Sequence, residues 1–176
     1  MKIDVSKLGQ EPLRFNEEFS VEPDRLDCDQ VTTPMRVRLE GEVRPSSGCF
    51  TVAGDCRVEG SVACSRCLEP VSWGVDEEFS VDYRAPAATP LGSELGLDQD
   101  ELDVAFLESD TLDLADLAAE QILLSLPMRV VCDESCAGLC PRCGANRNRD
   151  GACSCEPELD PRWQALAGLA GEDHSS

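Results

Sequence analysis

The sequence predicts an α+β protein in which an antiparallel β-meander forms a small barrel or sandwich, with flanking helices and a C-terminal cysteine-rich module. Three observations carry this prediction. Apolar and polar residues alternate with a period of two over much of residues 35–83, as they do in half-buried strands. Two later segments space their apolar residues as one face of a helix does. The last fifty residues contain six of the eleven cysteines.

The alternating segments predict roughly four to six short strands. They are separated by turn residues at 45–48, by Gly54-Asp55 and by the pair Cys64 and Cys67. The segments cover residues 35–43, 49–52, 56–64, 71–75 and 79–83. Residues 1–30 are mixed, with Phe15 and Phe19 on either side of an acidic pair, and we assign no strand there.

Beyond the strands, the pattern changes twice. Residues from about 85 to 101 are rich in proline, glycine and acids, which predicts an acidic surface loop, and residues 102–106 alternate once more. A helix is expected over about 111–126, with Asp113 near its start and Pro127 ending it. Its leucine-rich run is expected to pack in the core. We place a β-rich domain at 1–127 and a cysteine-rich module with a terminal helix at 128–176.

Composition and charge limit the function classes. The formal net charge is −20, and residues 61–127 carry fifteen acids against two bases. Such a chain repels phosphate backbones, which disfavours broad nucleic-acid binding and favours basic protein partners, unless the charge serves solubility alone. The N-terminal residues do not form a signal-peptide core, and no apolar run approaches the roughly 18 residues of a membrane span. We therefore expect a cytoplasmic protein without membrane contact.

The cysteines have metal-ligand spacing. In Cys140-Pro-Arg-Cys143-Gly144, two thiols three residues apart can reach one tetrahedral ion, and the glycine permits the tight turn between them. Reducing conditions in the cytoplasm disfavour disulfides, so the sequence predicts a C-terminal zinc-knuckle module holding one or two zinc ions. The expected ligands are Cys64, Cys67, Cys132, Cys136, Cys140, Cys143, Cys153 and Cys155.

The division of these eight thiols remains open. Sequence proximity favours one site from the last four cysteines and a second site from the first four, but a single site using two of the three pairs fits as well. An iron–sulfur cluster and a dithiol redox switch are the chemical alternatives. The remaining cysteines, Cys28, Cys49 and Cys56, are expected to fill apolar space in the sheet.

No pattern for catalysis is present. The sequence lacks a dinucleotide fingerprint, a phosphate-binding loop and a zinc-protease helix, and its one histidine, His174, lies at the C-terminal end. Sites made only of cysteine are normally closed and structural, so we expect no enzyme. Arg142, Arg147 and Arg149 form a small basic rim on the knuckle loop, where local cations could meet a phosphate.

Several motifs together resemble one known family. They are Cys64-Ser-Arg-Cys67-Leu-Glu-Pro70, the helix ending in Leu124-Ser-Leu-Pro127, and the tail from Cys136 to Arg162. In this order they resemble the metal-binding form of the YceD family of large-subunit ribosomal RNA accumulation proteins. The match covers roughly residues 35–165, and Arg147 stands where the family typically has leucine.

The resemblance implies a β-rich fold with flanking helices and a bacterial role in synthesis, processing or accumulation of large-subunit ribosomal RNA. It implies no catalytic activity. Partners would be ribosomal or other basic proteins, with ribosomal RNA association either direct or through them. The alternatives are a zinc-dependent interaction adaptor outside ribosome biology and a thiol-based redox sensor.

Overall fold

A long curved sheet forms the body of the protein. The computed structural model describes residues 2–46, 49–84, 104–107, 109–151, 153–155 and 162. The main sheet has five strands in the spatial order β2-β3-β4-β5-β6. These strands are β2 (Leu13–Val21), β3 (Met35–Ser46), β4 (Cys49–Ala63), β5 (Pro70–Arg84) and β6 (Val104–Phe106). Neighbours from β2 to β5 are antiparallel, whereas β6 runs parallel to β5.

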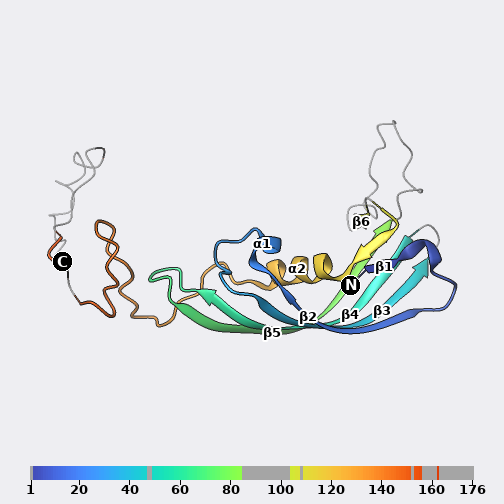
Figure 1. Cartoon of the computed structure of the whole chain (residues 1–176), viewed down its shortest axis with the longest axis horizontal. Coiled ribbons are helices and arrows are strands. Elements are labelled where there is room, and N and C mark those ends of the chain that lie inside the picture. The colour runs from blue at the N-terminus through green and yellow to red at the C-terminus, as the bar shows by residue number, and fades with distance from the viewer. Residues whose placement is uncertain are drawn as a thin grey trace, which may run out of the picture.

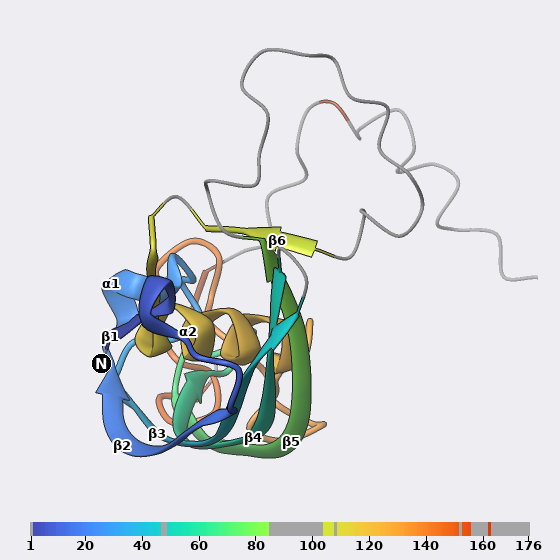
Figure 2. The ribbon, with the colours of Figure 1, turned by 90° about the vertical axis from the view of Figure 1, so that its right-hand side faces the viewer.

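Smaller elements surround the sheet. Strand β1 (Lys2–Asp4) pairs with β7 (Thr111–Asp113), and two short helices, η1 (Val5–Lys7) and α1 (Pro23–Leu26), lie in the N-terminal part. The longest helix, α2 (Leu114–Ser125), lies in the hollow of the sheet (Figure 1). Seen along the long axis, β2 to β5 curve around this helix (Figure 2). The core therefore lies between the concave face and α2.

A pair of facing glycines lets the strands approach closely where the sheet curves. Gly41 of β3 lies opposite Gly54 of β4. A β-carbon on Gly54 would lie 2.0 Å from the carbonyl oxygen of Glu40, so only glycine fits. In register with this pair, Phe15 of β2 and Phe79 of β5 are both buried and cover the missing side chains from either side.

Alternate residues of the central strands supply the core. Val37, Leu39 and Val43 of β3 are fully buried, and so are the inward residues of β4. Helix α2 faces them with Leu114, Leu117, Ala118, Ala119 and Ile122. The helix begins after Asp113, whose side chain accepts a hydrogen bond from the Ala115 N–H at 3.0 Å and caps the first turn.

The predicted β-rich α+β architecture is largely what the structure contains, with a cysteine-rich C-terminal part. The barrel or sandwich is not confirmed, because among the described residues the sheet is open at both ends of its strand order. Residues 49–63 and 70–84 each form one continuous strand, so the predicted interruption at Gly54-Asp55 is wrong. The unassigned residues 13–21 form β2, and residues 111–113 form β7 instead of the first turn of the helix.

Some side chains also differ from expectation. Cys56 is buried in the core, whereas Cys28 is half-buried and packs against the core, and Cys49 is only half-buried. In the leucine-rich run, Leu123 and Leu124 are exposed, the latter to 80%. The predicted acidic loop, the terminal helix apart from Arg162, and His174 lie outside the described residues.

Candidate metal centre

Four cysteines from two distant segments meet at one end of the sheet. Cys64 and Cys67 lie in the turn between β4 and β5, and Cys132 and Cys136 lie in the segment after α2. Their four Sγ atoms all lie within 4.8 Å of one another. The Sγ–Sγ distances are 3.6 Å from Cys67 to Cys132 and 3.9 Å from Cys64 to Cys136. We call this group the first tetrad.

These distances fit a tetrahedral metal site. Zinc–sulfur bonds of about 2.3 Å place the four sulfurs of a tetrahedron about 3.8 Å apart. A disulfide would need sulfurs about 2.05 Å apart, and all eleven cysteines are free. The first tetrad thus has the donor set and the spacing of a closed four-thiolate site.

The turn that carries Cys64 and Cys67 has a defined backbone. The Cys64 N–H donates to the Glu69 carbonyl at 2.9 Å, and the Leu68 N–H donates to the Cys64 carbonyl at 2.9 Å. Leu68 takes a left-handed conformation with φ of 61°, which is uncommon for a residue with a β-carbon. This turn directs both thiols to the same side, as a zinc knuckle requires.

Hydrogen bonds attach the second pair of ligands to this turn. The Ser65 N–H donates to the Val130 carbonyl at 2.8 Å. The Arg66 guanidinium donates to two backbone carbonyls, that of Glu134 at 2.9 Å and that of Cys136 at 2.8 Å. These hydrogen bonds therefore fix the position of Cys132 and Cys136 relative to the β4–β5 turn, in addition to any bond that their sulfurs make to an ion.

A second tetrad follows in the chain. Cys140, Cys143, Cys153 and Cys155 also have their sulfurs within 4.8 Å of one another. Its first turn repeats the hydrogen bonds of the other knuckle: the Gly144 N–H donates to the Cys140 carbonyl, and the Cys140 N–H donates to the Ala145 carbonyl, both at 2.8 Å. Gly144 has φ of 73° and occupies the position that Leu68 occupies in the first turn.

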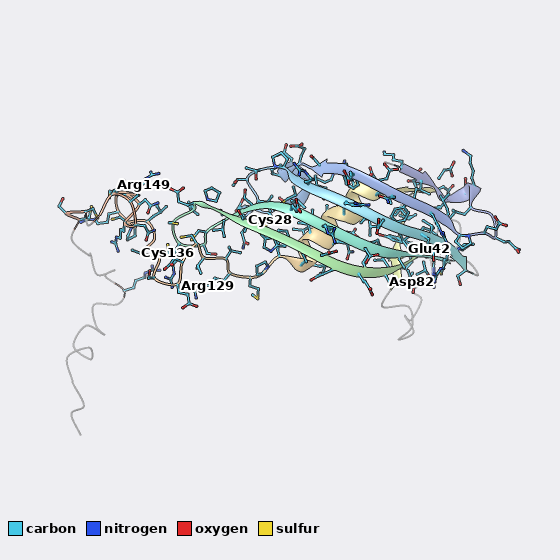
Figure 3. All side chains as sticks on the ribbon, turned by 90° about the horizontal axis from the view of Figure 1, so that it is seen from below. Cys28, Glu42, Asp82, Arg129, Cys136 and Arg149 are labelled. Carbon is cyan, nitrogen blue, oxygen red and sulfur yellow. The ribbon has the colours of Figure 1, made fainter. Side chains whose placement is uncertain are left out.

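The loop between Cys143 and Cys153 connects the two tetrads. Asn148 donates from Nδ2 to the Cys136 sulfur at 3.2 Å and accepts the Ala137 N–H on Oδ1 at 2.7 Å. The buried Asn146 donates to the Glu69 carboxylate at 3.2 Å. A loop closed by ligands of the second tetrad thus contacts a ligand of the first, and Figure 3 shows Cys136 and Arg149 together at this end of the protein.

The electrostatics favour one thiolate in each knuckle. Burial raises the pKa of Cys64, but backbone N–H groups of Cys67, Arg66 and Cys132 outweigh it and lower that pKa to about 6. Backbone N–H groups of Cys143 and Arg142, with the Cys153 thiol, lower the pKa of Cys140 to about 5. Thiolates are the metal-binding form of cysteine, so both knuckles are prepared for a cation.

The three arginines of the predicted basic rim have protein partners. Arg149 lies 3.3 Å from the Glu69 carboxylate, and Arg147 has a raised pKa chiefly because its guanidinium donates to the Cys140 sulfur. Arg142 also has an interaction partner. The three arginines therefore do not form a rim of unpaired cations.

The structure brings together all eight predicted ligands, in the division that sequence proximity favours. Two four-cysteine groups without disulfides could each hold a metal ion. The sequence interpretation missed Asn146, Asn148 and Glu69, which support the ligands. The sequence feature that could have indicated them was the presence of two asparagines in a loop flanked by cysteines. The described helices include none that is long and apolar enough to cross a membrane.

Comparison with known proteins places this chain in a family. The family model "Large ribosomal RNA subunit accumulation protein YceD" matches residues 52–170. An uncharacterized Mycobacterium tuberculosis protein is 28% identical, covering 98% of this chain and 83% of its own length. The uncharacterized protein YlbN of Bacillus subtilis is 27% identical over the full length of both chains.

A plant relative carries the family name. The chloroplastic "Large ribosomal RNA subunit accumulation protein YCED homolog 1" of Zea mays is 27% identical, and the match covers 81% of this chain and 54% of the maize protein. No solved structure matches. Since the family model covers more than half of the residues, the chain belongs to the YceD family of large ribosomal RNA subunit accumulation proteins.

Proposed function

We propose that this protein is a non-enzymatic cytoplasmic factor that supports synthesis, processing or accumulation of large-subunit ribosomal RNA, and that two structural zinc ions hold its C-terminal module. Membership of the YceD family supports the ribosomal role. The two cysteine tetrads are the observation that supports the zinc ions.

Zinc fits the tetrads because of their chemistry and surroundings. Eight thiols arranged as two groups of four leave no ligand position for a catalytic water, as a closed structural site requires. The segment from Cys132 to Cys155 includes few buried apolar side chains, so ion binding would supply much of its folding free energy. When bound, each ion would crosslink its knuckle to the second pair of ligands.

The charges favour a basic protein as the direct partner. The outward arginines of the sheet lie beside carboxylates: Arg36 is 4.0 Å from Glu59, and Arg38 is 3.8 Å from Glu18. Phosphate would have to compete with these acids, on a chain whose formal net charge is −20. Nascent ribosomal proteins are rich in Lys and Arg and would meet no such competition. Any ribosomal RNA association would then be indirect.

Depletion of the protein tests the ribosomal role. Sucrose-gradient profiles should show a deficit of large subunits, and the wild-type gene should restore them. A variant with Cys67→Ser and Cys143→Ser should fail to restore them if the ions are needed. Unchanged profiles after depletion would contradict the ribosomal role and favour an adaptor with another purpose.

The partner and the metal are tested separately. Captured ribosomal proteins should remain bound after nuclease treatment, whereas their loss would indicate RNA as the bridge. Elemental analysis of purified protein should give about two zinc ions per chain. Iron with visible absorption would indicate a cluster, and reversible metal loss under mild peroxide would favour a redox sensor.

A further inference from the structure

Strand β5 has an open edge along most of its length. All of its residues pair with β4 on one side, but on the other side only Asp82, Tyr83 and Arg84 pair with β6 among the described residues. From Pro70 to Val81, therefore, one row of backbone N–H and C=O groups has no strand partner in the described part of the chain. Such an edge is a template for an added strand.

The concave side of this edge is incompletely covered. Val71 and Val75 of β5 are only half-buried, whereas Val62 and Val58, opposite them on β4, are 1% exposed. Trp73, which lies opposite Gly60, is also half-buried. Among the strands of the main sheet, helix α2 lies closer to β2, β3 and β4 than to β5, which leaves the β5 side of the hollow less covered. An added strand with apolar residues at alternate positions would bury this half-exposed row.

Acidic groups surround the open edge. Asp76, Glu77 and Glu78 are consecutive and exposed on β5, and the strand has no basic residue before Arg84. Asp76 pairs with Arg57 of β4, so Glu77 and Glu78 carry the surplus charge. The surplus of carboxylates at this edge therefore favours a cationic ligand.

We propose that the open edge of β5 binds an extended, basic segment of a protein partner, which pairs with the strand. Its Lys and Arg residues would lie beside Asp76 and Glu78 on one face of the sheet, while its alternate apolar residues would cover Val75 and Trp73 on the other face, where Glu77 continues the same row. This inference rests on the proposed basic partner and names the surface and the mode of binding.

Charge favours a basic partner segment over two other possible occupants of this edge, the chain's own residues and a second copy of the protein. The chain's own residues 85–103 include five acids and no base, so they would meet like charge at this edge. A second copy pairing through β5 would place its three consecutive acids near those of the first copy. The opposite sheet edge, β2, is less acidic, because it carries Arg14 and only two acids, Glu17 and Glu18.

Fluorescence anisotropy with the full-length, metal-loaded protein tests the proposal. The probe is a fluorescein-labelled ten-residue peptide that alternates Lys and Val. We expect saturable binding, and binding weaker by at least about tenfold when alternate backbone amides of the peptide are N-methylated. A Glu-Val peptide should not bind. Equal binding of the N-methylated peptide would overturn strand addition, since charge alone would then account for the affinity.

Two charge reversals locate the site. Glu77→Lys with Glu78→Lys should weaken Lys-Val binding by at least about tenfold. The matched control, Glu17→Lys with Glu18→Lys on β2, changes the net charge equally and should alter binding by less than about threefold. Circular dichroism and metal content verify that both variants fold. Equal weakening by both pairs, or a β5-mediated dimer in sedimentation that excludes the peptide, would overturn the proposal.

The ribosomal role is read out independently. If depletion leaves the subunit profile unchanged, the proposed function fails whatever the peptide does. If depletion gives a deficit that the Glu77→Lys, Glu78→Lys variant fully corrects, the ribosomal role stands and the β5 docking surface is wrong.

Discussion

Replacing Asn148 tests whether the second knuckle loop stabilises the first metal site. The Asn148→Ala change removes the N–H···S bond to Cys136, which is 3.2 Å long, and the acceptor for the Ala137 N–H at 2.7 Å. Both hydrogen bonds hold a ligand that belongs to the other tetrad. We therefore expect weaker binding of the ion in the first tetrad, with the second site affected less.

The size of the effect follows from the hydrogen bonds that alanine cannot make. Removing a group that supports a metal ligand typically costs about 10- to 100-fold in metal affinity, or roughly 1.4–2.7 kcal/mol. The second N–H of Asn148 Nδ2 donates to Asn146 Oδ1 at 3.1 Å and orients the amide toward Cys136. Because the Arg66 hydrogen bond to Cys136 remains in the variant, we expect metal affinity to fall by about ten- to thirtyfold, in the lower half of that range.

Competition with a chromophoric chelator measures this affinity. Cys67→Ser and Cys143→Ser variants assign the two release phases to the two tetrads. Asn148→Asp keeps an acceptor for the Ala137 N–H but replaces the donor near Cys136 with a negative charge, so it should weaken binding more than alanine does. The matched control is Asn16→Ala on β2, which removes an exposed hydrogen bond to Glu40 of β3.

If both Asn148 variants released the first-site ion to the chelator as the wild-type protein does, the reasoning would be refuted. That result would mean that the four sulfurs and the Arg66 hydrogen bonds alone position Cys136. An equally weakened site in the Asn16→Ala control would also count against it, because the effect would then reflect general destabilisation.

Three other changes test the fold. Burial, together with Glu120 and Asp116, raises the pKa of Tyr83, the only tyrosine, to about 12, so its phenolate absorbance should appear at higher pH than in the unfolded chain. The stability that comes from this shift is present below the unfolded pKa and is lost as pH rises toward about 12, and Glu120→Gln should lower the pH midpoint of the phenolate titration. Gly54→Ala forces a β-carbon against the Glu40 carbonyl and should cost about 3 kcal/mol or more in urea unfolding, whereas Gly9→Ala, with nothing within 4 Å, should change stability by less than about 0.5 kcal/mol. Asp113→Ala removes the cap of α2 and should cost about 1 kcal/mol in the same assay, while Asp113→Asn should retain most of it.

The alternation of apolar and polar residues identified the central strands because their inward residues are apolar with few exceptions. The pattern failed at Gly54, because a glycine was interpreted as a strand break. In the structure this glycine permits the close approach to Gly41 inside a continuous strand. The pattern also missed β2, where Phe15 and Val21 are buried on one face but Glu17 lies between them in the same row. The exposure of Leu124 depends on how much of the sheet α2 covers, which helical spacing does not encode.

The grouping of the cysteines was predictable in part because a knuckle is a local structure. The spacing of Cys140 and Cys143 fixes a turn that needs no distant partner. The supporting residues were not predictable, because Asn148 contacts a sulfur that belongs to the other tetrad, and Glu69 reaches the loop across 77 residues of chain. Such interactions exist only after the two segments have docked.

An ion in the first tetrad would crosslink two distant parts of the chain and close the segment between them into a loop. It would join Cys64 to Cys136, which are 72 residues apart, so that the whole of β5 and α2 would lie inside the loop. A force applied at the two chain ends would bypass that loop until metal–sulfur bonds broke, and their rupture would then release roughly 240 Å of hidden length. A single-molecule pulling trace of the loaded protein should therefore include a late step of this length, which a chelator abolishes.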